Sequence, residues 1–111
     1  MSKREPSRLI EDIIESANKI LSYTENLSFE EFVNDNKTMD AVIRNFGIIG
    51  EAANRLPEDF KYKYTEVDWR RIIGFRNRIV HDYLGIDYSI VWEIKNSYLP
   101  VLISSLKTII A

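Results

Sequence analysis

The chain lacks cysteine entirely and has a single histidine, His81, among its 111 residues. Thiolate zinc sites, iron–sulfur clusters, disulfide bonds and cysteine nucleophiles are therefore excluded, and one chain cannot supply a site built from several histidines. We expect no metal and no cofactor. The absence of disulfides also predicts a protein of the reducing cytoplasm.

Long apolar runs are missing as well. No stretch approaches the ~18 uncharged apolar residues of a membrane span. The opening letters MSKREPSR carry charges where a secretory leader needs an apolar core. We therefore expect a cytoplasmic protein that makes no membrane contact. The net charge of −2 excludes a polycation that would coat nucleic acid, so any contact with nucleic acid must be local.

The composition is that of an ordinary globular protein, with 45% hydrophobic and 29% charged residues. A chain of this length forms one domain, which we place at residues 1–111. The sequence shows no internal repeat and no alternating strand pattern, and its four glycines are scattered. Apolar residues instead recur at spacings of three and four, which is typical of amphipathic helices. We predict an all-α fold, an antiparallel bundle of four to five helices.

The helix boundaries follow from capping residues and helix breakers. We predict a connector at residues 57–67 and an interruption of the last helix at Pro100. The expected helices are a first one from Pro6, a short one after the capping box Ser28–Glu31 and ending near Asn34, a long one from Asn36 or Thr38 to Pro57, one from Asp68 to Tyr83, and a last one from Asp87 to the C-terminus.

Two features of the expected helices bear on packing. Gly50 lies on the apolar stripe of the long helix, where a glycine costs about 1 kcal/mol relative to alanine, so we expect a neighbouring backbone to approach it closely. The C-terminal helix carries two adjacent apolar stripes, which is wider than one face of a bundle needs. The surplus predicts a partner chain. The two stripes comprise Val91, Ile94, Tyr98, Leu102 and Ile109, and Leu99, Ile103, Leu106 and Ile110.

The expected helix from Asp68 to Tyr83 places an arginine among apolar residues. On a helical wheel, Arg76 falls inside the arc that holds Trp69 and Ile72. An unpaired buried charge costs several kcal/mol, so Arg76 needs a partner or a route to solvent. We expect a carboxylate of the preceding long helix, Glu51, to orient it, although an arginine at such a position also reaches water along its methylenes.

A second stripe of the same helix is polar. Arg70, Gly74, Asn77 and His81 follow one another at steps of four, three and four residues. This spacing predicts the floor of a polar groove, in which Gly74 would let another helix come close. Singly, these residues are ordinary: a histidine on a polar stripe is more often solvated than catalytic.

The segment from Arg76 to Tyr83 reads RNRIVHDY, which is arginine, four residues, histidine, one residue and tyrosine. It follows a helix that contains the letters IGEA from Ile49 to Ala52. Together, these motifs resemble the HepT-like group of the HEPN superfamily, which are small all-helical proteins that include the ribonucleases of toxin–antitoxin pairs. The resemblance extends over nearly the whole chain.

The resemblance implies a metal-independent endoribonuclease toxin in which Arg76 and His81 are catalytic. Asn77 would assist, with Arg70 and Arg78 as further RNA-binding residues. Members of the group form homodimers with the active cleft at the two-fold axis, and a cognate nucleotidyltransferase antitoxin silences related toxins by attaching AMP to a tyrosine. That tyrosine matches Tyr83.

The chemistry of RNA cleavage suits these residue types. Attack by the 2′-hydroxyl requires a base, an acid for the leaving 5′-oxygen, and cationic donors for the charge on phosphorus. Histidine serves as acid or base, and arginine binds phosphate through its fork. Because one chain has one histidine, a mechanism with two histidines requires two chains. Arg76 and His81 would lie about 140° apart on an ideal helix, which also favours two copies.

The expected helix from Asp68 to Tyr83 is locally basic. Four arginines against two aspartates give it a charge of +2, so the rest of the chain carries −4. Positive charge in one segment favours phosphate binding there. A second hypothesis nevertheless stays open: a noncatalytic module that binds a nucleotide or the substrate of a partner nucleotidyltransferase, with Arg76 and His81 as phosphate ligands.

Overall fold

The computed structural model describes residues 5–80 and 85–110 and confirms the all-α prediction. None of the described helices is both long and apolar enough to span a membrane. Over the described residues the helices are α1 (Pro6–Thr24), α2 (Phe29–Val33), α3 (Asn36–Arg55), α4 (Glu58–Lys63), α5 (Trp69–Ile73), α6 (Phe75–Ile79), α7 (Tyr88–Ser97) and α8 (Leu99–Ile110).

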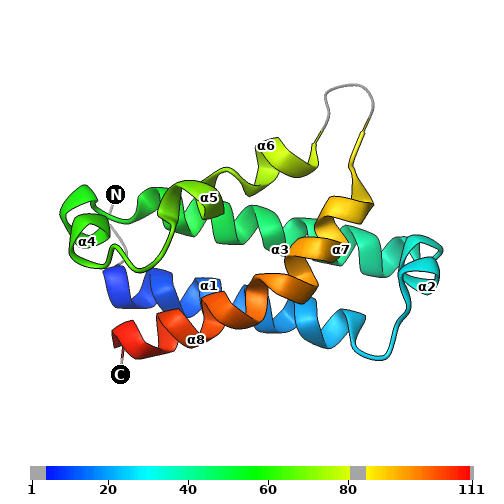
Figure 1. The fold of residues 1–111 in the computed structure, drawn as a ribbon, viewed down its shortest axis with the longest axis horizontal. Coiled ribbons are helices and arrows are strands. Elements are labelled where there is room, and N and C mark those ends of the chain that lie inside the picture. The colour runs from blue at the N-terminus through cyan, green and yellow to red at the C-terminus, as the bar shows by residue number, and fades with distance from the viewer. Residues whose placement is uncertain (1–4, 81–84, 111) are drawn as a thin grey trace.

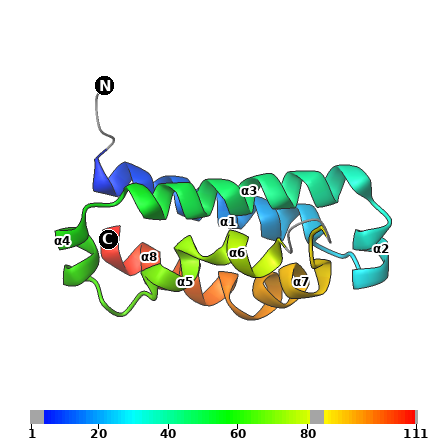
Figure 2. The ribbon, with the colours of Figure 1, turned by 90° about the horizontal axis from the view of Figure 1, so that it is seen from above.

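The helices form four antiparallel rods, two of which are broken (Figure 1). α1 and α3 are the long rods, whereas α5 with α6 and α7 with α8 make the other two. Seen from above, α1 and α3 form one layer, and the two broken rods lie against it (Figure 2). The short helices α2 and α4 close opposite ends of the bundle. The predicted bundle is thus present, with more breaks than the sequence predicts.

The ends of the first three helices agree with the prediction. Pro6 occupies the first turn of α1, where its missing N–H costs nothing. Ser28 Oγ accepts a hydrogen bond from the Glu31 N–H at 3.1 Å, and Glu31 Oε1 accepts one from the Ser28 N–H at 2.9 Å. This reciprocal pair is the predicted capping box. Asp35 caps α3 by accepting hydrogen bonds from Thr38, which lowers the pKa of its carboxyl.

The predicted connector at residues 57–67 is wrong in part, because it contains α4. This helix follows Pro57 and has only six residues, which is too short to show a helical apolar period. Its first turn holds Glu58 and Asp59 and its last turn holds Lys61 and Lys63. Carboxylates at the positive end and lysines at the negative end of the helix dipole stabilise the helix. The sign of these charges was the available clue to the helix.

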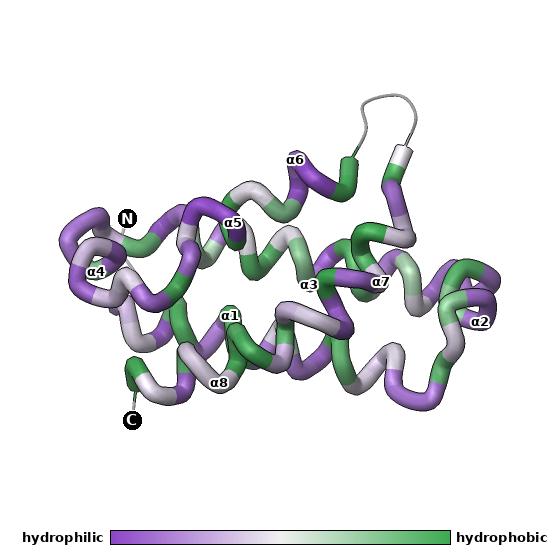
Figure 3. The backbone as a smooth tube through the Cα atoms, in the orientation of Figure 1, coloured by the Kyte–Doolittle hydropathy of each residue, from purple (hydrophilic) through white to green (hydrophobic). Residues whose placement is uncertain are grey.

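The core lies between the four rods and is built almost entirely from apolar side chains. Figure 3 colours much of α5 and α6 as hydrophilic, and the polar residues of these helices, Arg70, Arg71, Arg76, Asn77 and Arg78, are exposed. The fully buried side chains of largest volume are Phe32, Phe75, Ile10, Ile13, Ile20, Ile49, Ile72, Ile79, Ile94, Leu99, Leu102 and Leu106.

The single helix predicted from Asp68 to Tyr83 is the main error of the sequence analysis. Asp68 does cap the first part, since its Oδ1 accepts the Arg71 N–H at 3.1 Å. The helix then stops at Gly74, whose N–H bonds back to Arg70 O at 2.9 Å. A Cβ at Gly74 would lie 3.1 Å from that carbonyl oxygen. Gly74 therefore ends α5, and within the described chain only the backbone of α5 lies within 4 Å of the added Cβ, so the approach of another helix at Gly74 stays a prediction.

The break at Gly74 changes which side chains face the core. On one continuous helix that starts at Trp69, Phe75 would lie at about 240°, outside the apolar arc that holds Arg76. In the structure Phe75 is 0% exposed and its ring packs edge-on against Phe46 and Tyr98, with centroids 5.5 and 5.9 Å apart. Arg76 is exposed instead. Of the two alternatives for Arg76, a hydrogen-bonded partner or a route to solvent, the structure shows the route to solvent.

The end of α6 also differs from the prediction. Val80 is extended, with φ −103° and ψ 121°, and forms an isolated antiparallel bridge with Ile86. The Asp87 N–H donates to Ile79 O at 2.7 Å. The chain therefore runs in opposite directions at Val80 and at Ile86. The two successive β-branched residues Ile79 and Val80 weaken the helix at its end. His81, Asp82, Tyr83 and Leu84 lie outside the described residues.

The last rod is interrupted as expected, two residues before Pro100. α7 begins after Asp87, whose Oδ1 accepts the Ser89 N–H at 3.1 Å, and ends at Ser97, with Tyr98 as its C-cap. The surplus of apolar residues, however, needs no partner. Because α7 and α8 present different faces, this chain itself buries most of both stripes: Val91, Ile94, Leu99, Leu102, Ile103 and Leu106. The argument for a partner from these residues is therefore wrong.

The first prediction concerns Phe75 and Arg76. The continuous helical wheel places Arg76 in the apolar arc and Phe75 outside it, whereas the structure buries Phe75 and exposes Arg76. Replacing Phe75 with alanine removes a buried ring and should lower the free energy of unfolding by about 3–5 kcal/mol. Replacing the exposed Arg76 with alanine should change it by less than about 0.5 kcal/mol. Urea denaturation followed by far-ultraviolet circular dichroism measures both, and Phe75→Leu serves if Phe75→Ala does not fold. Equal losses from the two alanine variants would contradict the broken helix.

The second prediction uses one substitution at two glycines. Gly47 is inside α3 with nothing within 4 Å of an added Cβ, so Gly47→Ala should raise the free energy of unfolding by about 1 kcal/mol. Gly85 has φ +89°, so Gly85→Ala should lower it by about 1–2 kcal/mol. The same urea experiment compares them. If both substitutions changed the free energy of unfolding in the same direction, either the helical backbone at Gly47 or the positive φ at Gly85 would be contradicted.

Candidate functional site

The rod formed by α5 and α6 separates two hollows, and Ile73 lines both. The Arg70 hollow, of about 810 Å³, lies between α4 and this rod, and the Arg76 hollow, of about 450 Å³, lies between this rod and α3. The Arg70 hollow is lined by Glu58, Lys61, Tyr62, Thr65, Glu66, Val67, Asp68, Trp69, Arg70, Ile73, Gly74 and Asn77. The Arg76 hollow is lined by Ile43, Phe46, Gly47, Gly50, Glu51, Asn54, Ile73, Arg76, Ile79 and Val80.

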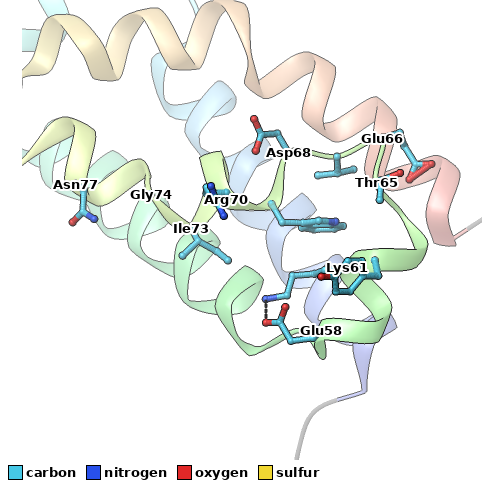
Figure 4. Close-up of a pocket in the computed structure, with 12 residues that line it drawn as sticks. Glu58, Lys61, Thr65, Glu66, Asp68, Arg70, Ile73, Gly74 and Asn77 are labelled. Carbon is cyan, nitrogen blue, oxygen red and sulfur yellow. Dashed lines mark ion pairs between the residues drawn. The ribbon is translucent and has the colours of Figure 1, made fainter.

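The polar stripe predicted from the sequence lines the Arg70 hollow. Arg70, Gly74 and Asn77 all belong to its wall, in spite of the helix break. Figure 4 shows Arg70 on α5 and Lys61 on α4 near the middle of the site, with Asn77 set apart on α6. The structure thus gathers three of the four stripe residues, and the fourth, His81, lies outside the described residues.

Ion pairs and hydrogen bonds fix one wall of the Arg70 hollow. Lys61 Nζ lies 3.2 Å from Glu58 Oε1, and the Lys61 side chain is only 11% exposed. The Trp69 indole N–H donates to Tyr64 O at 3.0 Å and so ties α5 to the segment after α4. Arg70, in contrast, is exposed and forms no ion pair with another described residue. Its guanidinium is available to a ligand.

The Arg76 hollow is bounded by α3 on one side and α6 on the other. The backbone of α5 approaches α3 at Gly50, where an added Cβ would lie 3.7 Å from Ile72 O and Ile73 O. The predicted approach to Gly50 is therefore confirmed, at ordinary contact distance. Arg76 is exposed and has no ion pair with any other described residue. A phosphate entering this hollow would meet a guanidinium that is paired with no carboxylate of the described residues.

Glu51 does not orient Arg76 as predicted, although both line the Arg76 hollow. Its Oε1 instead lies 3.2 Å from Arg55 Nε, one turn along α3. Both side chains of this pair are 63% exposed, so the pair contributes little to stability. The structure thus places Glu51 on the correct side of the bundle for the predicted role, without the contact.

The other two arginines of the basic segment, Arg71 and Arg78, line neither hollow. Arg71 stacks on Tyr98 with its guanidinium carbon 4.0 Å from the ring centroid. Burial raises the pKa of the Tyr98 phenol, and the Arg71 guanidinium opposes that shift. Arg78 is exposed and forms no part of either hollow. The arginines therefore point to different surroundings, and the predicted patch contains Arg70 and Arg76 at most.

Two lining residues were not predicted from the sequence: Tyr62 lines the Arg70 hollow and Asn54 lines the Arg76 hollow. Asn54 follows Glu51 by three residues, so helical spacing on α3 could have placed it on the same face. Tyr62 lies in the segment that was read as a connector. Its position at the hollow depends on α4, which the sequence did not show.

The family comparison agrees with the resemblance stated from the sequence. Residues 13–109 match the model of the family described as "Ribonuclease HepT-like". A protein of Methanocaldococcus jannaschii that is named provisionally as an RNase is 39% identical over 110 residues, which cover 99% of this chain and 91% of that protein. A second such protein of that organism is 40% identical over 100 residues, covering 90% and 92%.

A further relative is the "Probable ribonuclease HepT" of Thermococcus cleftensis, 38% identical over 100 residues that cover 90% of this chain and 91% of that protein. No solved structure is similar enough to count as a match. The family description favours the catalytic hypothesis over the noncatalytic binding module. The chain belongs to the HepT-like ribonuclease family and is an endoribonuclease.

Proposed function

We propose that this ribonuclease cleaves RNA without a metal ion, at a composite site of a homodimer, with Arg76 and His81 as its catalytic residues. The observation that carries the proposal is the exposed Arg76 guanidinium, which forms no ion pair within residues 5–80 and 85–110 and lies in a hollow walled by α3 and α6. Val80 lines the same hollow, and His81 directly follows it in the sequence. Arg76 would bind the phosphate and stabilise its developing negative charge.

The proposed reaction is transesterification within the RNA. A base removes the proton of the 2′-hydroxyl, whose oxygen attacks the adjacent phosphorus. The bond from phosphorus to the 5′-oxygen breaks, an acid protonates that oxygen, and the products end in a 2′,3′-cyclic phosphate and a 5′-hydroxyl. His81 is the only imidazole of the chain. Asn77 and Arg70 would assist by binding RNA beside Arg76, and Arg78 would contact a more distant phosphate.

A homodimer supplies what one chain lacks. If one histidine acts as the base and another as the acid, two subunits must meet at the cleavage site. The support is the count of histidines and the family's pattern, since the apolar surplus of α8 is covered within the chain. Residues 1–111 would then form one domain, of which two copies make the enzyme.

The toxin role and its control are part of the same proposal. A cytoplasmic toxin needs an inhibitor, and Tyr83 lies two residues after His81. A cognate nucleotidyltransferase would transfer AMP from ATP to the Tyr83 hydroxyl, forming a phosphodiester and releasing pyrophosphate. The added phosphate places negative charge near the binding site for the RNA backbone and would repel the substrate.

The third prediction tests the catalytic pair. Purified protein in excess chelator should cut labelled total RNA and leave cyclic-phosphate ends, whereas Arg76→Ala and His81→Ala should each reduce the rate by about 100-fold or more. Arg44→Ala, an exposed arginine on α3 that lines neither hollow, is the matched control and should keep the wild-type rate. Mass spectrometry confirms beforehand that Tyr83 is unmodified. Loss of cleavage on chelation alone would refute the metal-independent mechanism.

The fourth prediction tests the composite site by mixing subunits. Equal amounts of wild type and His81→Ala, after exchange, should form only about one quarter wild-type dimers. If cleavage needs both histidines, the rate per wild-type subunit falls to about one half, and light scattering shows a dimer. A rate per wild-type subunit that is unchanged by mixing would contradict the two-histidine site.

A further inference from the structure

We propose that the Arg70 hollow binds one unpaired RNA nucleotide next to the cleaved phosphate, and that it prefers a base with an exocyclic amine to uracil. The inference rests on the proposed function, because it describes the path of the RNA beyond Arg76. It adds a base-specific subsite to a site that otherwise contacts only phosphate.

The first argument is the position of the hollow. Ile73 lines both hollows, and the consecutive residues Arg76 and Asn77 line one each. An RNA strand with a phosphate at Arg76 therefore meets the Arg70 hollow as it crosses α6. The volume of about 810 Å³ lies in the range of binding sites for small molecules. It is sufficient for a single nucleotide.

The second argument is the exposed aromatic ring at this hollow. Tyr62 is 80% exposed, the highest value among the large hydrophobic residues that are exposed in the described chain. Proteins that bind single-stranded RNA stack unpaired bases on such rings. Arg70, which forms no ion pair with another described residue, supplies its guanidinium for the phosphate of the stacked nucleotide. Lys61 is already paired with Glu58 and largely buried.

The third argument is the sign of the charge in the hollow. Its lining holds the carboxylates Glu58, Glu66 and Asp68 against the cations Lys61 and Arg70. An excess of carboxylates is unsuitable for several phosphates but suitable for a base, because a carboxylate only accepts hydrogen bonds. Adenine, cytosine and guanine donate from an exocyclic amine, whereas uracil donates only from its N3–H, which lies between two carbonyl oxygens that a carboxylate repels.

Glu66 is the carboxylate best placed to read the base. Glu58 is paired with Lys61, and Asp68 Oδ1 is occupied by the Arg71 N–H. Glu66 is exposed and has no hydrogen bond or ion pair with another described residue. Figure 4 shows Glu66 beside Thr65, at the end of the hollow that is far from Asn77. The proposed nucleotide thus has its phosphate at Arg70, near the middle of the hollow, and its base toward the end at Glu66.

The first part of the test measures binding without cleavage. His81→Ala protein is titrated into fluorescein-labelled pentamers of cytidine, adenosine or uridine, and anisotropy gives each Kd. In this background Tyr62→Ala should weaken binding of the cytidine pentamer by about tenfold, and Tyr62→Phe should restore it. Tyr23→Ala, an exposed tyrosine on α1, is the matched control and should leave Kd unchanged. Equal effects of Tyr62→Ala and Tyr23→Ala would overturn the stacking site.

The second part measures which base is preferred. The cytidine and adenosine pentamers should bind about tenfold more tightly than the uridine pentamer, and Glu66→Gln should reduce this ratio because an amide also donates to uracil carbonyls. Glu25→Gln, outside the hollow, is the control. Equal binding of all three pentamers, or a ratio that survives Glu66→Gln, would overturn the base preference.

Cleavage by the wild type, mapped on labelled RNA, separates this inference from the proposed function. If no RNA is cut although pentamer binding depends on Tyr62 and Glu66, the subsite stands and the proposed catalytic mechanism fails. If RNA is cut and Tyr62→Ala changes neither binding nor the positions of the cuts, the mechanism stands and the subsite is refuted.

Discussion

The burial of Phe75 is the contact on which the site depends. Its ring is held edge-on between Phe46 of α3 and Tyr98 at the junction of α7 and α8, so it joins three rods of the bundle. The contacts of the Phe75 ring fix the rotation of α6 about its own axis. This rotation buries Phe75 and turns the next residue toward the neighbouring hollow. With Phe75 fixed, Arg76 must point to solvent, where its guanidinium needs no buried partner.

The break at Gly74 allows α6 to adopt this rotation independently of α5. A continuous helix from Trp69 would place Trp69 and Phe75 on different faces, and only one of them could reach the core. The break after five residues allows both to be buried, at 7% and 0% exposure. Helices of five residues have little stability of their own, so α5 and α6 are held in place by the side chains they bury. Burial of these rings therefore stabilises the fold and positions the Arg70 and Arg76 hollows.

The sequence was sufficient to predict features that depend on local chemistry. The capping box at Ser28, the cap at Asp68 and the interruption near Pro100 each require only neighbouring residues, and all are present. The break at Gly74 was not predictable in the same way, since a helical wheel assumes one continuous phase. Its cause is the contact of Phe75 with residues far along the chain. The wheel still grouped Arg70, Gly74 and Asn77 correctly, because all three lie on the outer side of the rod.

The uneven distribution of charge follows from the same architecture. The rod of α5 and α6 presents its arginines to different surroundings: Arg71 stacks on Tyr98, while Arg70 and Arg76 form no ion pair in the part of the chain that the structure describes. A chain with a net charge of −2 can therefore offer two isolated guanidiniums instead of a broad basic surface. Because long-range attraction of RNA to such a surface is weak, the proposed RNA complex would rely on contacts made inside the hollows. Contacts of this kind discriminate between bases, which a continuous basic patch does not.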